Sequence, residues 1–271
     1  MLRVLLEGLL DLLWPPRTTC LICEGPANGN GLVCLTCWGA MPFPEGLSRC
    51  RQCMRPLARG VGACEDCAGG QPYERVWAIG LHRGALREAV HHLKFGGRRE
   101  LGEPLGRLLA AQIQSPYDLV VPVPLHPSRL RQRGYNQAGL LAAELAACMG
   151  VPMVERALIR LRRTGHQAKL ERQARLKNLS GAFQVAPGES VRLTGKSVLL
   201  VDDVLTTGAT ATAAATVLRS AGVRCVDLAV LAVSDKPVRL ARATSVDPPH
   251  PLRSSDSSSA PPPGATRLGA T

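Results

Sequence analysis

Eight of the ten cysteines in this 271-residue chain form a repeat that constrains its fold more than any other feature. Each of the first four cysteines is followed by another 30 positions later, and every pair has the spacing C-x-x-C. The eight are Cys20, Cys23, Cys34, Cys37, Cys50, Cys53, Cys64 and Cys67. A C-x-x-C turn presents two thiolates to one ion, so two such turns complete a tetrahedral zinc site. The pattern predicts a double zinc ribbon over residues 18–70.

A disulfide framework is the competing interpretation of these cysteines. The apolar segment Met1–Trp14 is interrupted by Glu7 and Asp11 and has no small-residue cleavage site, so we predict no secretory signal. We therefore expect a cytoplasmic protein, and reducing cytosol disfavours disulfides. Four thiolates leave no open position on zinc, which makes both sites structural. The repeat favours sequential pairing of the cysteines, but an interleaved pairing also fits the spacing.

Both ends of the chain differ from its middle. In residues 1–17, Arg3, Glu7 and Asp11 give an apolar helix a narrow polar stripe, which predicts an amphipathic helix. We expect this helix, too short to span a bilayer, to dock on the protein itself, with membrane-surface attachment as the alternative. Residues 243–271 are rich in proline and serine and are predicted to be disordered. The two remaining cysteines, Cys148 and Cys225, lie in aliphatic stretches and are predicted to be buried.

Residues 71–242 have the alternating pattern of an α/β domain. Short apolar runs predict strands at Leu119–Val123, Ser197–Val201 and Cys225–Val233. Helical spacing of apolar residues predicts helices at Leu86–Phe95, Leu101–Gln114, Tyr135–Met149 and Thr210–Ala221. Alternating strands and helices predict a parallel sheet with helices on both faces.

A thirteen-residue string, VLLVDDVLTTGAT, begins at Val198 and carries the strongest functional signal. Asp202 and Asp203 follow an aliphatic strand, at the end where ligands of open α/β sheets bind. A loop of small residues then enters a helix, whose first amides attract anions. The predicted phosphate loop comprises Val204, Leu205, Thr206, Thr207, Gly208, Ala209 and Thr210. An Asp-Asp pair alone also suits a helix cap or a surface turn.

The string resembles the 5-phosphoribosyl 1-pyrophosphate (PRPP) signature of type I phosphoribosyltransferases. The resemblance implies that Asp202 and Asp203 hold the ribose hydroxyls and that the loop binds the 5′-phosphate. Further motifs resemble the ComF family of competence-associated, phosphoribosyltransferase-like proteins. They are Leu93-Lys94-Phe95, Val121 to His126, Arg133 to Gln137, and Arg163-Thr164 with Gln167, Arg175, Asn178 and Ala182-Phe183. Double cysteine ribbons occur in the longer members of that family.

The basic residues supply candidate anion contacts, in a chain of formal net charge +12. We predict that Arg129 and Arg133, in the expected loop Leu125–Gly134, contact pyrophosphate, and that Lys94 binds an anion. Each also suits a solvated surface cation. The resemblance also implies that the basic segment Arg163–Asn178 lies at the position of a mobile catalytic loop.

Two functions follow from the resemblance. The first is an enzyme that uses Mg²⁺ to transfer phosphoribosyl from PRPP to an acceptor, because charge builds on the leaving pyrophosphate. The second is a binding module for PRPP and single-stranded DNA that assists DNA uptake or processing with a helicase-like partner. The net charge and the ribbons favour the second, and the thirteen-residue string favours the first.

Overall fold

A computed structural model describes residues 19–27, 32–162 and 181–241, all in one unit that ends at Ala241. The predictions for the N-terminal helix (1–17), the basic segment Arg163–Asn178 and the tail (243–271) concern residues outside these ranges. The boundaries predicted between the zinc module and the α/β domain stay predictions. Within the described residues, every helix is too short or too polar to cross a membrane.

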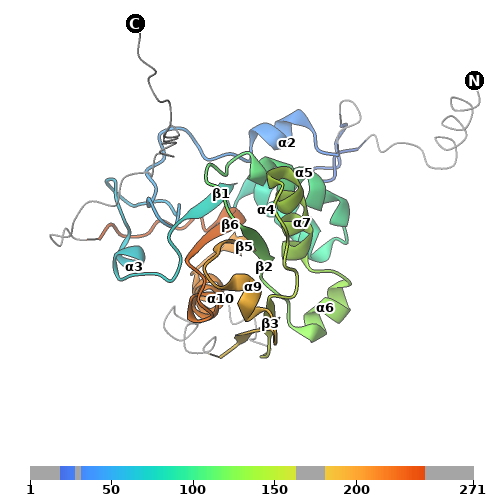
Figure 1. Cartoon of the computed structure of the whole chain (residues 1–271). Helices are drawn as coiled ribbons and strands as arrows, with labels where there is room; N and C mark the ends of the chain where they lie inside the picture. The colour runs from blue at the N-terminus through green and yellow to red at the C-terminus, as the bar shows by residue number, and fades with distance from the viewer. Residues whose placement is uncertain (1–18, 28–31, 163–180, 242–271) are drawn as a thin grey trace, which may run out of the picture. The chain divides into compact units, whose positions relative to one another are not determined.

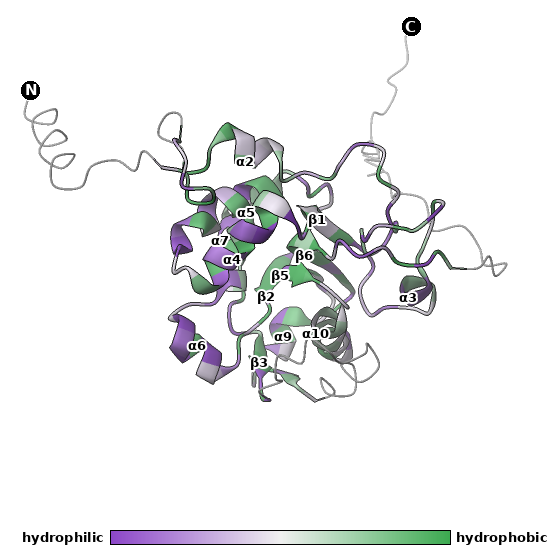
Figure 2. Ribbon diagram, turned by 180° about the vertical axis from the view of Figure 1, so that it is seen from behind, coloured by the Kyte–Doolittle hydropathy of each residue, from purple (hydrophilic) through white to green (hydrophobic). Residues whose placement is uncertain are grey.

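A four-stranded sheet, parallel at every neighbouring pair, forms the centre of this unit (Figure 1). Its strands are β1 (Val76–Leu81), β2 (Leu119–Pro122), β5 (Ser197–Leu205) and β6 (Cys225–Val233). They lie in the order β1-β6-β5-β2, so the two longest strands are central. Figure 2 shows that the strands are largely hydrophobic. Near-continuous apolar runs of this kind are typical of parallel strands that are covered on both faces.

Helices cover both faces of the sheet, as predicted. One face carries α4 (Gly84–Phe95), α5 (Gly102–Ala110) and α7 (Gln137–Met149); the other carries α9 (Ser190–Leu193) and α10 (Ala209–Ser220). Successive side chains of a strand point to opposite faces. Leu200 of β5 accordingly packs in the core beneath α10, whereas Leu199 packs in the core beneath α7.

The predicted strands are confirmed, with one correction that affects the candidate site. The predicted range Cys225–Val233 matches β6 at both ends, and β2 ends one residue earlier than predicted. The range Ser197–Val201 was too short, because β5 continues to Leu205 through its pairing with β6. The two aspartates therefore lie inside the strand rather than after it. Strand β1 had no prediction, and its six residues are all buried.

The predicted helices are also present, with shifted ends. Helix α7 begins at Gln137 rather than Tyr135 because Asn136 caps it, accepting a hydrogen bond from the amide of Ala138, and it ends at Met149 as predicted. The helix predicted at Leu101–Gln114 is α5, which ends at Ala110, four residues earlier than predicted, and a 3₁₀-helix, η1 (Arg99–Leu101), precedes it.

The region predicted as the loop Leu125–Gly134 contains a further short helix, α6 (Pro127–Arg133). Proline at its first turn and a cap from His126 explain why the chain is helical there. A two-stranded antiparallel sheet, β3 (Leu158–Arg160) with β4 (Phe183–Val185), completes the domain.

The prediction that the two cysteines outside the ribbons are buried is wrong. Cys148 is exposed on α7, and its thiol lies 3.8 Å from Glu144 Oε1. Cys225 is half-buried at the start of β6, where its thiol donates to Glu74 Oε2 at 3.1 Å. Burial raises the pKa of Cys225 to about 12, so the thiol stays protonated near neutral pH.

Two of the contacts between the zinc ribbons and the sheet domain are made by the backbone itself. In the second ribbon, backbone bonds join Ala58 to Val238 and Glu65 to Arg239, so residues that follow β6 complete the ribbon. The linker between the ribbons crosses β1 at Gly80, where a Cβ atom would overlap the carbonyl oxygen of Met41. Glycine is needed at this position for close approach of the two backbones.

We expect Gly80→Ala to lower the free energy of unfolding by about 1–3 kcal/mol, because the linker must move away from β1. Chemical denaturation measures this difference. Gly39→Ala is the matched control, since a Cβ there meets nothing within 4 Å. Equal stability of the two variants would contradict this account of the contact.

Candidate functional site

The loop from β5 to α10 has the conformation expected of an anion cradle. Gly208 has φ 79°, in the left-handed region, and Ala209 begins the helix directly after it. A glycine at the N-cap supplies no side chain to the first-turn amides, which leaves them available to an anion. Thr206 is exposed, and Thr207 and Thr210 are half-buried. The hydroxyl-bearing part of the predicted loop therefore reaches the surface, whereas Leu205 and Ala209 are buried.

Asp203 is the point at which three separate sequence motifs meet. Its side chain is buried, and it faces the helices α4 and α7. Lys94 Nζ lies 2.5 Å from Oδ1, and Gln137 Nε2 donates to Oδ2 at 2.5 Å. A buried carboxylate needs such partners, because leaving it unpaired in a low-dielectric interior is costly. Lys94, predicted to bind an anion, is thus paired with a carboxylate of the chain itself.

Arg133 extends this network toward the surface. Its guanidinium donates to Gln137 Oε1 and lies over the ring of Phe95, 5.3 Å from the centroid. Burial lowers the pKa of Arg133, which the charge of Asp203 partly offsets. Phe95 is itself exposed, so the arginine and the ring together form part of the rim around Asp203.

Asp202 has a different environment from Asp203. It is half-buried, and its Oδ1 accepts a hydrogen bond from the amide of Asp203 at 2.8 Å. Burial, followed by the charge of Asp203, raises the pKa of Asp202 to about 7, against the opposing charges of Lys94 and Arg160. The two carboxyl groups are therefore not equivalent. Asp203 is held by a cation and an amide, whereas Asp202 takes up a proton near neutral pH.

Three residues near the aspartates were not predicted as site residues. Gln137 ends one of the family motifs but had no predicted role, and its burial is set by the packing of α7. Arg160 ends β3 and acts electrostatically on Asp202, while burial and the neighbouring Arg129 lower its own pKa. His82 follows β1, and burial and Lys94 lower its pKa. A polar residue directly after a buried strand was the available sequence signal for His82.

Arg129 lies on α6, half-buried and close enough to Arg160 to affect its pKa. The structure thus brings Lys94, Arg133 and Gln137 together around Asp203, while Arg129 lies with Arg160 on the side of Asp202. The predicted roles of these residues toward a ligand stay predictions.

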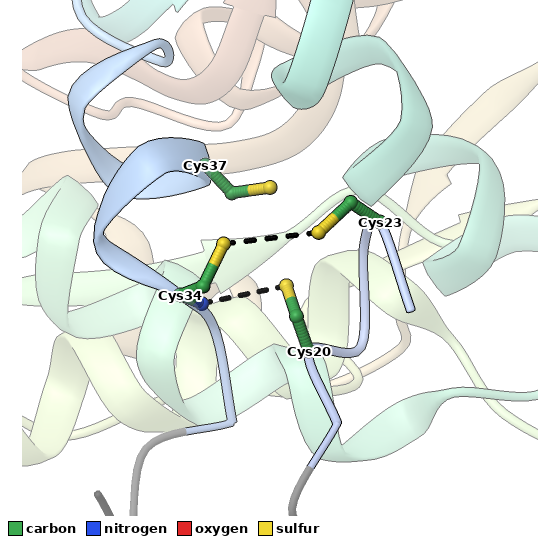
Figure 3. Close-up of side chains that lie close together, drawn as sticks. All are labelled: Cys20, Cys23, Cys34 and Cys37. Carbon is green, nitrogen blue, oxygen red and sulfur yellow. Dashed lines mark hydrogen bonds between the residues drawn. The ribbon is translucent and has the colours of Figure 1, made fainter. Parts of the chain in front are cut away.

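The cysteines form two clusters of four, and the pairing is sequential. In each cluster, the four Sγ atoms all lie within 4.8 Å of one another. Figure 3 shows the sulfurs of Cys20, Cys23, Cys34 and Cys37 facing one another. Cys23 and Cys34 are 3.7 Å apart at Sγ, as are Cys53 and Cys64. A zinc–sulfur bond of about 2.3 Å gives a tetrahedral edge of about 3.8 Å, so the clusters fit zinc.

Two family models match the chain in these same regions. The double zinc ribbon domain matches residues 9–68, and the phosphoribosyl transferase domain matches residues 131–247. Fold, cysteine clusters and family models together define a phosphoribosyltransferase-type α/β domain joined to a double zinc ribbon.

Three relatives identify the family more narrowly. "DNA utilization protein YhgH" of Salmonella typhimurium is 32% identical over 202 residues, covering 70% of this chain and 86% of the relative. "Competence protein F" of Haemophilus influenzae is 30% identical, and the match covers 75% of this chain and 92% of that relative. "Competence protein ComFC" of Bacillus subtilis is 29% identical, and the match covers 66% of this chain and 74% of that relative. The chain belongs to the ComF family.

A solved structure of glutamine PRPP amidotransferase from B. subtilis, complexed with ADP and GMP, also matches the chain. It is 22% identical, with a TM-score of 0.38, and the match covers 52% of this chain and 30% of that one. Similarity at this level adds nothing to the fold that the strand order and the family models already define.

We expect Lys94→Met to destabilise the protein by about 3–5 kcal/mol, because it leaves the buried Asp203 carboxylate without its cation. Adding Asp203→Asn should recover much of this loss, since no buried charge then remains. Denaturation of the two single variants and the double variant measures the coupling. Arg87→Met, which removes an exposed cation from the same helix, is the control. Additive effects of the two substitutions would show that the pair is not coupled.

Proposed function

We propose that the protein binds PRPP at the carboxyl end of β5 and, with Mg²⁺, transfers its phosphoribosyl group to an acceptor nucleophile. The observation that carries the proposal is the juxtaposition of Asp202 and Asp203 with the Gly208 turn and the first amides of α10. In open α/β sheets this edge is where ligands bind. Membership of the ComF family and the match to the phosphoribosyl transferase domain support the same choice.

The aspartates are proposed to hold the two ribose hydroxyls. A carboxylate oxygen has two acceptor positions, so Asp203 retains capacity for a hydroxyl beyond its bonds to Lys94 and Gln137. The pairing fixes its orientation before a ligand binds, which avoids an ordering cost on binding. Asp202 accepts a hydroxyl best as a carboxylate, and its raised pKa implies weaker sugar binding below about pH 7.

The 5′-phosphate is proposed to occupy the turn from Thr206 to Thr210. Its negative charge suits the positive end of α10, and the threonine hydroxyls add donors. Transfer breaks the bond between the ribose anomeric carbon and pyrophosphate, so charge builds on the leaving group. Arg129 and Arg133 are the proposed contacts of that group, and Mg²⁺ would supply further charge neutralisation. A cytoplasmic location would suit both PRPP binding and reduced zinc ligands.

Titration calorimetry with PRPP, with and without Mg²⁺, tests this proposal. We expect binding to the wild type that Mg²⁺ strengthens, and loss of binding in Asp203→Asn, because the ribose loses a charged acceptor. Glu155→Gln removes an exposed acid and should bind normally. Labelled PRPP with a panel of nucleobases then tests transfer. Absence of PRPP binding to the zinc-loaded wild type would end the proposal, and binding without pyrophosphate release would reduce it to a binding function.

A second candidate function is favoured by α6 and by the names of the relatives. This helix carries Arg129, Arg131 and Arg133, has no buried residue, and is coloured hydrophilic in Figure 2. The relatives are named for DNA utilization and competence. We propose, as the alternative, a non-catalytic accessory factor that binds PRPP and single-stranded DNA in DNA uptake or processing. In that case the zinc ribbons would contact a helicase-like partner.

Binding of single-stranded DNA should weaken as salt rises, with log affinity falling linearly against log salt. Arg131→Gln should reduce the magnitude of that slope by about one phosphate contact. Arg192→Gln, which removes an exposed arginine from α9, should leave the slope unchanged. Fluorescence anisotropy measures all three proteins, and Asp203→Asn should retain DNA binding. If the affinity does not respond to salt, the basic helix is not a DNA contact.

A further inference from the structure

The two zinc sites differ in exposure although their sequences repeat. All four cysteines of the second site are buried, and the most exposed of them, Cys67, reaches only 5%. In the first site Cys20 and Cys37 are equally buried, but Cys23 is exposed and Cys34 is half-buried. Cys23 and Cys34 are therefore the two cysteines of the first site that are most open to solvent and small reagents.

The two sites also differ in the hydrogen bonds that their sulfur atoms accept. One is shared by both sites: Cys34 N donates to Cys20 Sγ at 3.4 Å, and Cys64 N donates to Cys50 Sγ at 3.3 Å. In the first site Ile22 N also donates to Cys20 Sγ at 3.4 Å, a bond that does not reach Cys23 or Cys34. The second site has in addition the buried guanidinium of Arg55. This group donates to Cys53 Sγ at 3.3 Å and to Cys64 Sγ at 3.7 Å.

Arg55 is held in place by Asp66, whose Oδ2 lies 2.8 Å from its terminal nitrogen. Thirty positions earlier, where the repeat places their counterparts, the chain has Gly25 and Thr36. Neither residue supplies a cation. The cation present at the second site therefore has no equivalent at that position in the first.

This difference sets the reactivity of the thiolates. Four thiolates and one Zn²⁺ carry a net charge of about −2, and a cation that donates hydrogen bonds to sulfur stabilises that charge. It also draws electron density from the sulfur and makes it a weaker nucleophile. Exposure acts separately, because a reagent must reach the sulfur that it attacks. Both effects protect Cys53 and Cys64 and leave Cys23 and Cys34 reactive.

We propose that the first zinc site is a modification site that reacts selectively with small-molecule disulfides through Cys23 and Cys34. The Cys23 thiolate attacks the disulfide, forming a mixed disulfide and releasing one thiolate of the reagent. Cys34, whose sulfur lies 3.7 Å from that of Cys23, then attacks the Cys23 sulfur and expels the second reagent thiolate. Two protein thiolates are oxidised, the reagent disulfide is reduced to two thiolates, and zinc leaves as Zn²⁺.

The contacts of the first ribbon give this reaction a structural consequence. Arg98, which precedes η1, donates to the carbonyl of Leu21 and pairs with Glu24. Leu21 lies in the first C-x-x-C turn and Glu24 directly follows it, so loss of zinc there releases Arg98. The second ribbon is instead held by backbone pairing to the segment after β6. Oxidation thus loosens the first ribbon while the second stays attached to the sheet.

The test is zinc release from the zinc-loaded full-length protein, treated with 4,4′-dithiodipyridine in the presence of a chromophoric chelator. We expect two phases, each releasing about one zinc per chain, with the second at least about tenfold slower. Peptide mass spectrometry during the first phase should find modification at Cys23 and Cys34. Release of both zinc ions at one rate, or earlier modification at Cys53 and Cys64, would overturn the proposal.

Variants of Arg55 separate the effect of the cation on the rate of zinc release from the effect of exposure. Arg55→Met should accelerate the second phase about tenfold, and Arg55→Lys should accelerate it less. Arg51→Met, which removes an exposed arginine from the same ribbon, is the control and should leave both phases unchanged. An unchanged second phase in folded Arg55→Met would refute the role of the cation.

The reverse substitution tests the same idea if Arg55→Met does not fold. Gly25→Arg with Thr36→Asp places the missing ion pair in the first ribbon. A Cβ at Gly25 lies 3.5 Å from Cys23 Sγ, an ordinary contact that the site accepts. This double variant should slow the first phase several-fold, and an unchanged first phase would count against the proposal.

Discussion

The ion pair between Lys94 and Asp203 is the interaction on which the candidate site depends. A carboxylate that is almost fully buried at the end of a central strand is stable only with a charged partner. Lys94 supplies the charge from α4, and Gln137 supplies a second donor from α7. One buried charge therefore fixes two helices against β5. It also brings three motifs that are far apart in the chain together at one point.

The same pairing makes the two aspartates chemically distinct. Because neighbouring residues of a strand face opposite sides, Asp203 enters the core between the sheet and α7, while Asp202 faces Arg160. Asp203 is thus a fixed acceptor, and Asp202 is a carboxyl group whose charge changes near neutral pH.

The sequence was informative where a local pattern determines the structure. The cysteine repeat predicted both clusters, and the thirteen-residue string predicted the strand, the glycine turn and the helix that follows. Prediction from the sequence failed where pairing between distant segments determines the structure. The extension of β5 to Leu205 depends on β6, and the closure of the second ribbon depends on Val238. The partners of Asp203 could not be predicted from the sequence either, because Lys94 and Gln137 become buried only when α4 and α7 pack on the sheet.

The most direct measurement is a crystal structure of the protein with ribose 5-phosphate. Our account predicts the phosphate against the amides of Thr207 to Thr210, and the ribose hydroxyls within hydrogen-bonding distance of Asp202 and Asp203. Asp203 should still contact Lys94 in that complex. A ligand bound elsewhere, with the turn around Gly208 empty, would contradict the account.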